Sequence, residues 1–524
     1  MKRLATLLAM VWSAGASQDP PVFQADTRLV QINVVVHDKN GPVAKLTKGD
    51  FVLTDKGQTR EISVFAAESS RERPAGAPLP ANTFSNRPHA GAGSLGGVTI
   101  ILLDRLNTLS AAGHENYENN VAWFEDHALG YAKQQLIVFV KEMNPNDRVA
   151  IYSLSKSLSV LCDFTGDRDQ LLEILTKYKA TSITSREKAE PGDIHTPSAE
   201  LNELIGRDRR TLATMENGER TQVTMSALFA IARHVADIPG RKNLVWLTAN
   251  LPFSGVAAGR ALSRANLAIY PIDARGLIPP ASAPGTLDDT PMVPGLGTPL
   301  GGRISAPSKL PGIDTMQQLA DETGGRAFFN TNDLSGAIRK AVEDAEVTYT
   351  LGFYPDPGSL DEKFHELKVH VRHSGYEVRS PRGYFALKDT AVSAAQNQST
   401  AMEAIRSPLE SSAIHVQATL ERGTDSLAVA GSIDLHDLQL SAALTCDVEL
   451  SIVQQDAAGT ILGQMRNRYN VKLTKESYAA HLKSGLIFRE DLTPKDGLAT
   501  LRILVSDLSD ARVGSLIIPF SQVK

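Results

Sequence analysis

Residues 98–108 read Val-Thr-Ile-Ile-Leu-Leu-Asp-Arg-Leu-Asn-Thr, and this stretch decides the fold. The first six residues form a continuous apolar run, which is typical of a strand covered by helices on both faces. The run stops at Asp104, and mostly polar residues follow. Because open parallel sheets bind ligands at the carboxyl ends of their strands, Asp104 is the first candidate functional residue.

Outward from this strand, strand-like and helix-like patterns alternate over residues 97–346. Further strands are predicted at 149–154, 159–164, 243–247, 267–272 and 327–329, and helices at 116–143, 169–178, 224–236, 315–323 and 334–346. Such alternation predicts an α/β doubly wound, mainly parallel sheet. Two insertions interrupt it: residues 185–220 are charged and expected to be partly helical, and residues 276–312 are rich in Pro and Gly and expected to be irregular.

Short strand patterns flank this domain on both sides, at residues 27–67 and 347–387. Each set is too small to make a stable sandwich of its own. We therefore predict that the two sets pair into one β-sandwich, with the α/β domain inserted between its halves. Residues 68–96 are rich in Ser, Pro, Ala, Gly and Asn and are predicted to be a linker.

The last part of the chain has a different pattern. Residues 388–408 are predicted to be a polar linker with a short helix. Many short strands follow at regular spacing in residues 410–524. This spacing predicts a C-terminal, all-β, Ig-like sandwich.

The first residues have the pattern of an export signal. Lys2 and Arg3 precede a short apolar run, and small residues follow at 14–16, so residues 1–17 are predicted to be a signal peptide. The apolar run is too short to cross a bilayer, and no later stretch resembles a transmembrane helix. We therefore expect an exported protein, periplasmic or extracellular, with no transmembrane segment in the mature chain.

The composition indicates a globular protein. Of the 524 residues, 42% are hydrophobic and 22% are charged, a balance that separates the chain from disordered proteins. Lys and Arg total 54 against 59 Asp and Glu. Because nucleic-acid binding needs clustered positive charge, no nucleic-acid partner is expected. The two cysteines, Cys162 and Cys446, are interpreted as isolated buried thiols, with a disulfide as the alternative.

Several longer segments resemble the von Willebrand factor A (VWA) family. These segments are residues 102–108, 238–247 and 270–276, with 351–355, 382–384 and the residues around 49–51 outside the α/β region. The resemblance covers residues 27–387 and is closest to the exported VWA-related proteins typical of acidobacteria. It implies a VWA-like or Rossmann-like fold for the α/β domain and a role in binding other macromolecules.

The resemblance also implies a metal site. Typical VWA domains hold a divalent cation with an Asp-x-Ser-x-Ser motif, a Thr and a second Asp. Carried over to this chain, Asp104 is the first carboxylate, Thr108 replaces the second Ser, and Thr224, opening a helix, is the separate Thr, with Thr221 as the alternative. Such oxygen ligands suit Mg²⁺.

This chain departs from the family pattern at two places. Leu106 stands where the first Ser is expected, and residues 248–250 read Thr-Ala-Asn where the second Asp is expected. The resemblance therefore implies a degenerate metal-ion-dependent adhesion site that binds Mg²⁺ or another divalent cation weakly. The alternative is that Asp104 accepts backbone N–H bonds at the turn from strand to helix.

Polar residues near the other strand ends are predicted to form a binding rim. They are Asn107, Thr248, Asn250 and Asp273. For Asp273 the alternative interpretation is a cap of the turn before Gly276.

Motifs of serine hydrolases, P-loop enzymes and zinc proteases are missing from the sequence, so no catalytic residue is assigned. The leading hypothesis is an exported, non-catalytic protein that binds a protein or envelope partner through the strand-end face. A structural envelope component without metal and a hydrolase of surface polymers are the alternatives.

Overall fold

The computed structural model describes residues 29–69, 79–87, 97–108, 121–178, 199–251 (except 237 and 239), 267–277, 312–386 (except 357 and 358) and 392–523. The predicted signal peptide and most of the predicted irregular insertion at 276–312 lie outside these ranges. Within them, no helix is long and apolar enough to cross a membrane. Cys162 and Cys446 are both buried and unpaired with each other.

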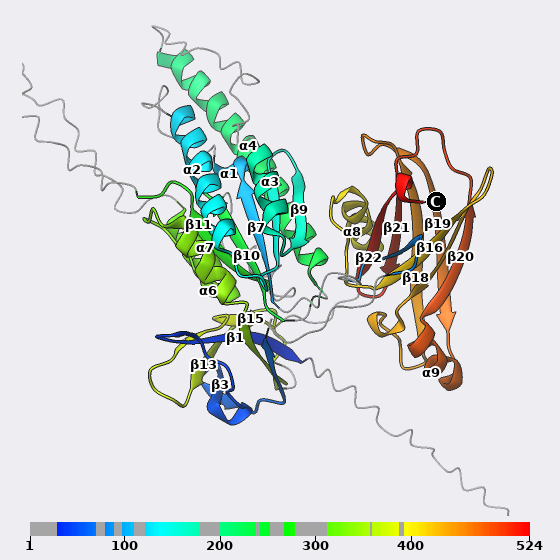
Figure 1. Ribbon diagram of the computed structural model, residues 1–524, viewed down its shortest axis with the longest axis horizontal. Coiled ribbons are helices and arrows are strands. Elements are labelled where there is room, and N and C mark those ends of the chain that lie inside the picture. The colour runs from blue at the N-terminus through cyan, green and yellow to red at the C-terminus, as the bar shows by residue number, and fades with distance from the viewer. Residues whose placement is uncertain are drawn as a thin grey trace, which may run out of the picture.

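A five-stranded sheet with the order β11-β10-β7-β8-β9 forms the centre of the α/β domain (Figure 1). Its strands are β7 (Val98–Asp104), β8 (Val149–Leu154), β9 (Leu158–Thr165), β10 (Lys242–Thr248) and β11 (Leu267–Asp273). Only β9, at one edge, runs antiparallel to its neighbour. Every residue of the four parallel strands is buried, which explains why their sequences lack a polar face. The prediction of a mainly parallel α/β sheet is confirmed.

Helices cover both faces of this sheet. One face packs against α2 (Val121–Glu142), α3 (Arg168–Lys177) and α7 (Leu334–Glu343). The other face packs against α4 (Ala199–His234) and α6 (Ile313–Thr323). Successive residues of β7 enter the two cores in turn, with Ile100 on one side and Ile101 on the other, as strand geometry requires.

Two elements differ from the sequence predictions. α4 is a single helix of 36 residues that absorbs much of the charged insertion predicted at 185–220, so Thr224 lies inside the helix and does not open it. The residues before Thr224 are mostly good helix formers without proline, and they let the helix start earlier. The strand predicted at 327–329 is reduced to one bridge between Phe328 and Ile272.

The first β-domain combines strands from before and after the α/β domain. One sheet has the order β14-β1-β12-β5, with β2 paired to β1, and the other has the order β15-β13-β3-β4. The strands are β1 (Val30–Asp38), β2 (Gly41–Pro42), β3 (Phe51–Asp55), β4 (Gln58–Arg60), β5 (Val64–Ser69), β12 (Val347–Phe353), β13 (Phe364–Val371), β14 (Glu377–Arg379) and β15 (Gly383–Phe385). Both sheets contribute side chains to one core, including Val34 and Leu53. Each sheet therefore joins segments that lie almost 300 residues apart.

A buried ionic network joins this β-domain to the α/β domain. At its centre is Asp344, which is fully buried. Its carboxylate accepts from Tyr270 Oη at 2.6 Å and from Arg379 Nη1 at 2.7 Å, and it lies 2.9 Å from His37 Nε2. Arg241 donates to Tyr270 Oη at 2.8 Å. The two domains are therefore joined by ionic contacts as well as by packing.

The C-terminal domain consists of two antiparallel sheets, β20-β17-β16-β6 and β19-β18-β21-β22 (Figure 1). Its strands are β16 (Val416–Arg422), β17 (Leu427–Ile433), β18 (Thr445–Gln455), β19 (Ile461–Lys472), β20 (Leu486–Leu492), β21 (Thr500–Asp507) and β22 (Val513–Pro519). Helix α8 (Ala394–Arg406) packs on β21 and β22 through Ala404 and Ile405, and α9 (Lys475–Ser484) connects β19 to β20.

Part of the linker predicted at 68–96 belongs to the C-terminal domain. Strand β6 (Thr83–Ser85) pairs with β16 at the edge of its sheet. The next residue, Asn86, is buried, donates through Nδ2 to the carbonyl oxygens of Ser411 and Ile414, and accepts from Val416 N at 2.8 Å. The segment predicted as a linker therefore contains a strand, because an exposed strand edge offers hydrogen bonds to nearby backbone.

The α/β domain and the C-terminal domain meet at the end of α4. Ser412 donates through Oγ to the carbonyl oxygen of His234 at 2.8 Å, and the His234 ring contacts the carbonyl oxygen of Glu410 at 2.9 Å. Ser412 N donates to the carbonyl oxygen of Arg233, whose guanidinium pairs with Glu403. The last carbonyl groups of the helix, which have no partner inside it, are therefore capped by the neighbouring domain.

This contact predicts a pH dependence of stability. Burial raises the pKa of Glu410 from 4.5 to about 7. A raised carboxyl pKa favours the folded state below its ordinary pKa, and this contribution is lost as the pH rises through 7. His234 acts in the same direction: burial lowers its pKa, but the hydrogen bonds and charges of Asp163 and Glu410 together outweigh burial and raise it.

We expect the free energy of unfolding to fall by up to about 3 kcal/mol between pH 5 and pH 8, and Glu410→Gln to remove most of this fall. Urea unfolding of the wild type and the variant at several pH values measures this change in the free energy of unfolding. Parallel pH curves for the two proteins would contradict the assignment to Glu410.

Candidate functional site

The sheet delivers Asp104 to its carboxyl edge, as the sequence predicts. Asp104 is the last residue of β7, which lies between β8 and β10 in the middle of the sheet. The chain then turns at once into the short helix α1 (Arg105–Thr108). Because β7, β10 and β11 are parallel and in register, their last residues lie along the same edge.

The Asp104 carboxylate is closed off at this edge. Its exposed fraction is 0%. Oδ1 accepts from Asn107 N at 2.9 Å, and Oδ2 accepts from Asn107 Nδ2 and from Trp246 Nε1, each at 2.8 Å. The hydroxyl of Thr248 also interacts with this carboxyl group, but it donates its hydrogen to the Asn250 carbonyl oxygen at 2.8 Å. A carboxylate offers about four acceptor positions, and N–H groups of Asn107 and Trp246 occupy three of them.

With three acceptor positions filled and none of its surface exposed, this carboxylate is poorly placed to bind a cation. Burial raises the pKa of Asp104, and the hydrogen bonds from Asn107, Trp246 and Thr248 offset part of this rise. A metal ion needs lone pairs, whereas Asn107 and Trp246 present N–H hydrogens to the Asp104 carboxylate. The residues at this strand end therefore do not fit the divalent cation that the family resemblance implies. The geometry matches the alternative interpretation, in which Asp104 accepts N–H bonds at the turn.

The two threonines of the expected cation site lie close to Asp104 but bond elsewhere. Thr108 is buried, and its Oγ1 donates to the Asp104 carbonyl oxygen at 2.6 Å. Thr224 is buried on α4, and its Oγ1 accepts from Asn107 Nδ2 at 3.0 Å. Asn107 Nδ2 therefore lies between Asp104 and Thr224, where a shared cation would have to lie.

The predicted rim residues are more buried than expected. Asn107 and Thr248 are fully buried, and Asp273 is 1% exposed. Asp273 accepts from Arg275 at both carboxylate oxygens, at 2.8 and 2.7 Å, and from Arg275 N at 3.0 Å. Asn250 is partly exposed. The Asp273 contacts correspond to the turn-capping alternative for this residue.

Several residues of this edge were not found from the sequence. Trp246 donates to the carboxylate from the neighbouring strand. A buried indole N–H generally needs an acceptor, and this was the sequence signal that was overlooked. Three arginines also lie at this edge. Arg105 follows Asp104, Arg220 donates from α4 to Asn107 Oδ1 at 3.4 Å, and Arg275 pairs with Asp273.

The hydrogen-bonded, buried state of Asp104 predicts that metal ions do not stabilise the α/β domain. We expect about 10 mM Mg²⁺ or Mn²⁺ to leave the Tm of the α/β domain unchanged, because a ligand stabilises a protein only if it binds the folded state. Differential scanning calorimetry in chelator-treated buffer, with and without added metal, measures this Tm. A concentration-dependent rise in Tm that disappears in Asp104→Asn would show that the site opens and binds the ion.

The sheet, its covering helices and the carboxylate at the end of its central strand define a VWA-like α/β domain, here combined with two β-domains. No family model matches the chain, and no curated protein matches it either. Several solved structures are similar to this chain, and some of them are VWA-domain proteins.

Three of these structures illustrate the likeness. BatB from Bacteroides thetaiotaomicron is 15% identical at a TM-score of 0.24, covering 48% of this chain and 98% of its own. A von Willebrand factor type A protein from Catenulispora acidiphila is 10% identical at a TM-score of 0.25, covering 66% and 80%. The ArnB paralog VWA2 from Sulfolobus acidocaldarius is 8% identical at a TM-score of 0.25, covering 83% and 78%. Likeness at this level assigns no function to the chain.

Proposed function

We propose that this chain is an exported, non-catalytic binding protein that presents the strand-end face of its α/β domain to a protein or envelope partner. The proposal takes the export signal from the sequence pattern at residues 1–17. It differs from the metal-dependent version in one respect: contact with the partner requires no cation. The two β-domains position the α/β domain.

The observation that carries this proposal is the charge at the strand-end face. Both strand-end carboxylates, Asp104 and Asp273, are buried and bonded to protein donors. Arg105 and Arg220 are partly exposed at the same edge, whereas the charge of Arg275 is paired with Asp273. A guanidinium binds a carboxylate through two parallel hydrogen bonds. The face therefore offers positive charge to an acidic group, the role that the cation has in typical VWA domains.

The same burial argues against catalysis at this edge. A general acid or base must reach a proton of the substrate, and neither Asp104 nor Asp273 is accessible to one. Their hydrogen bonds hold both carboxylates in the role of acceptors within the protein. The arrangement can anchor loops and bind charge.

A pull-down from envelope extract with immobilised, full-length mature protein tests the proposal. The paired variant Arg105→Ala/Arg220→Ala is expected to reduce the captured partner at least about tenfold, and capture should weaken with salt because exposed ion pairs are screened. Arg148→Ala is the matched control, since Arg148 precedes β8 at the opposite edge of the sheet. Added chelator should have no effect.

Three outcomes would overturn this function. One is that no protein is retained above the level of an unrelated exported domain. A second is equal retention by the wild type and the paired variant after both pass a fold check by circular dichroism. The third is loss of the partner on addition of chelator, which would indicate a cation-dependent contact.

A further inference from the structure

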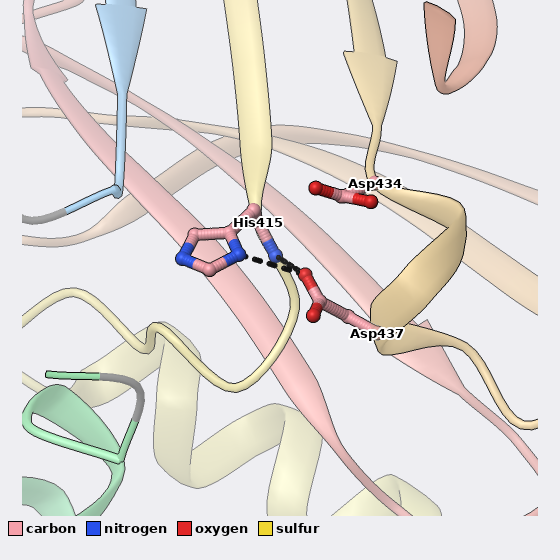
Figure 2. Close-up of side chains that lie close together, drawn as sticks. All are labelled: His415, Asp434 and Asp437. Carbon is pink, nitrogen blue, oxygen red and sulfur yellow. Dashed lines mark hydrogen bonds and ion pairs between the residues drawn. The ribbon is translucent and has the colours of Figure 1, made fainter. Parts of the chain in front are cut away.

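One group of side chains in the C-terminal domain has the composition of a metal site. His415, Asp434 and Asp437 each place one nitrogen or oxygen atom so that the three atoms lie within 4.8 Å of one another (Figure 2). All three residues are partly buried. Among the described residues no other group of three such ligands comes together in this way.

The backbone holds these three residues in a defined arrangement. His415 directly precedes β16 and Asp434 directly follows β17, and these two strands pair in antiparallel fashion at Val416 and Ile433. Asp434 N donates to the His415 carbonyl oxygen at 3.0 Å, which extends the pairing by one residue. Paired strands position side chains more precisely than loops do, and these two residues directly adjoin such a pair.

A short 3-10 helix brings the third residue back over the strand ends. It spans Leu435–Asp437, with Asp434 as its N-cap. Leu435 and Leu438 are buried in the core of the C-terminal domain and anchor this turn. As Figure 2 shows, the Asp437 carboxylate therefore faces His415.

Hydrogen bonds connect the side chains of this group to each other and to their neighbours. Asp437 Oδ2 lies 2.8 Å from His415 Nδ1 and accepts from His415 N, also at 2.8 Å. Asp434 Oδ1 lies 2.8 Å from His436 Nδ1, and Asp434 Oδ2 pairs with Arg87. Arg87 is 60% exposed, so its side chain can turn into solvent and release that oxygen.

We propose that His415 Nδ1, one oxygen of Asp434 and one oxygen of Asp437 bind a zinc ion, with water completing the shell. Two ligands in a tetrahedral zinc site lie about 3.3 Å apart, so the contact between His415 and Asp437 has to widen by only about half an ångström. An imidazole ligand favours zinc over Mg²⁺ and Ca²⁺, which prefer oxygen. This site lies in a different domain from the strand-end face and does not depend on the proposed function.

Zinc titration of the tag-free, full-length mature protein after chelator treatment tests the site. Calorimetry is expected to show one saturable equivalent of Zn²⁺, and Co²⁺ as a substitute should give the visible absorption of a four-coordinate complex. His415→Gln and Asp437→Asn should each weaken zinc binding at least about tenfold, the range seen when metal-site partners are lost.

Two further variants make the result specific. Arg87→Ala removes a cation that competes for Asp434, and we expect it to strengthen zinc binding severalfold. His370→Gln replaces an exposed histidine of β13 in another domain and should change nothing. Circular dichroism identifies any variant that fails to fold, and Arg87→Ala leaves all three proposed ligands in place.

The proposal is overturned if the wild type shows no saturable equivalent of zinc. It is also overturned if folded Asp437→Asn binds zinc as tightly as the wild type, or if Arg87→Ala binds no more tightly. Weakening by His370→Gln equal to that by His415→Gln would place the bound zinc at scattered surface histidines.

Discussion

Replacing Asp344 by alanine is expected to lower the free energy of unfolding by about 3–5 kcal/mol, because it leaves buried positive charge without its partner. Arg379 donates to this carboxylate at 2.7 Å, and His37 lies 2.9 Å from it. Burial by itself would raise the pKa of Asp344, but these neighbours outweigh it and lower the pKa. The stabilisation is therefore present above the ordinary pKa of an aspartate and lost as the pH falls through the lowered value.

Urea unfolding of Asp344→Ala at neutral pH measures this effect. Glu377→Ala is the matched control, because Glu377 pairs with the same Arg379 but is 61% exposed, and exposed pairs contribute about 0–1 kcal/mol. Since the network joins the first β-domain to the α/β domain, we also expect the variant to unfold in two separated steps. A loss below about 1 kcal/mol, equal to that of Glu377→Ala, would show that the network is not important for stability.

The second large effect is expected at Asp104. Asp104→Ala should also lower the free energy of unfolding by about 3–5 kcal/mol, because three buried N–H donors, two of Asn107 and one of Trp246, lose their acceptor. Trp246→Phe removes one donor and replaces the indole by a smaller aromatic ring, so the lost hydrogen bond and the cavity together should lower the free energy by about 1–3 kcal/mol. Glu142→Ala is the control in the same domain, with a carboxylate that is 63% exposed.

Chemical denaturation with and without Mg²⁺ separates a structural Asp104 from a metal ligand. A structural carboxylate gives the same large loss under both conditions. A metal ligand gives a loss that grows with the concentration of Mg²⁺, because the wild type alone would then be stabilised. A variant as stable as the wild type in metal-free buffer would contradict the hydrogen-bonded arrangement at the strand end.

The proposal for the strand-end face and the proposal for the zinc site can each be disproved without affecting the other. The first is tested by arginine variants in the α/β domain and a captured partner. The second is tested by ligand variants in the C-terminal domain and a bound ion. If zinc bound but no partner were captured, the C-terminal site would remain and the proposed function would be lost.

The sequence by itself determined the α/β sheet and the position of Asp104 at its carboxyl edge. Both follow from the unbroken apolar run of β7, because a strand buried on both faces can tolerate no polar face, and the first carboxylate after it must lie at the strand end. Local information was also sufficient for the alternation of helices and strands. It was not sufficient for the start of α4, where residues compatible with a helix continue without a stop signal.

Only the tertiary structure decided what Asp104 does. Trp246 lies 142 residues along the chain and Thr224 lies 117 residues from Asn107, and no local pattern records that these side chains meet. The same holds for β6, whose three residues carry no strand pattern but complete the edge of β16. Whether a carboxylate binds a cation or accepts hydrogen bonds depends on which donors fill its lone pairs, and here distant segments supply those donors.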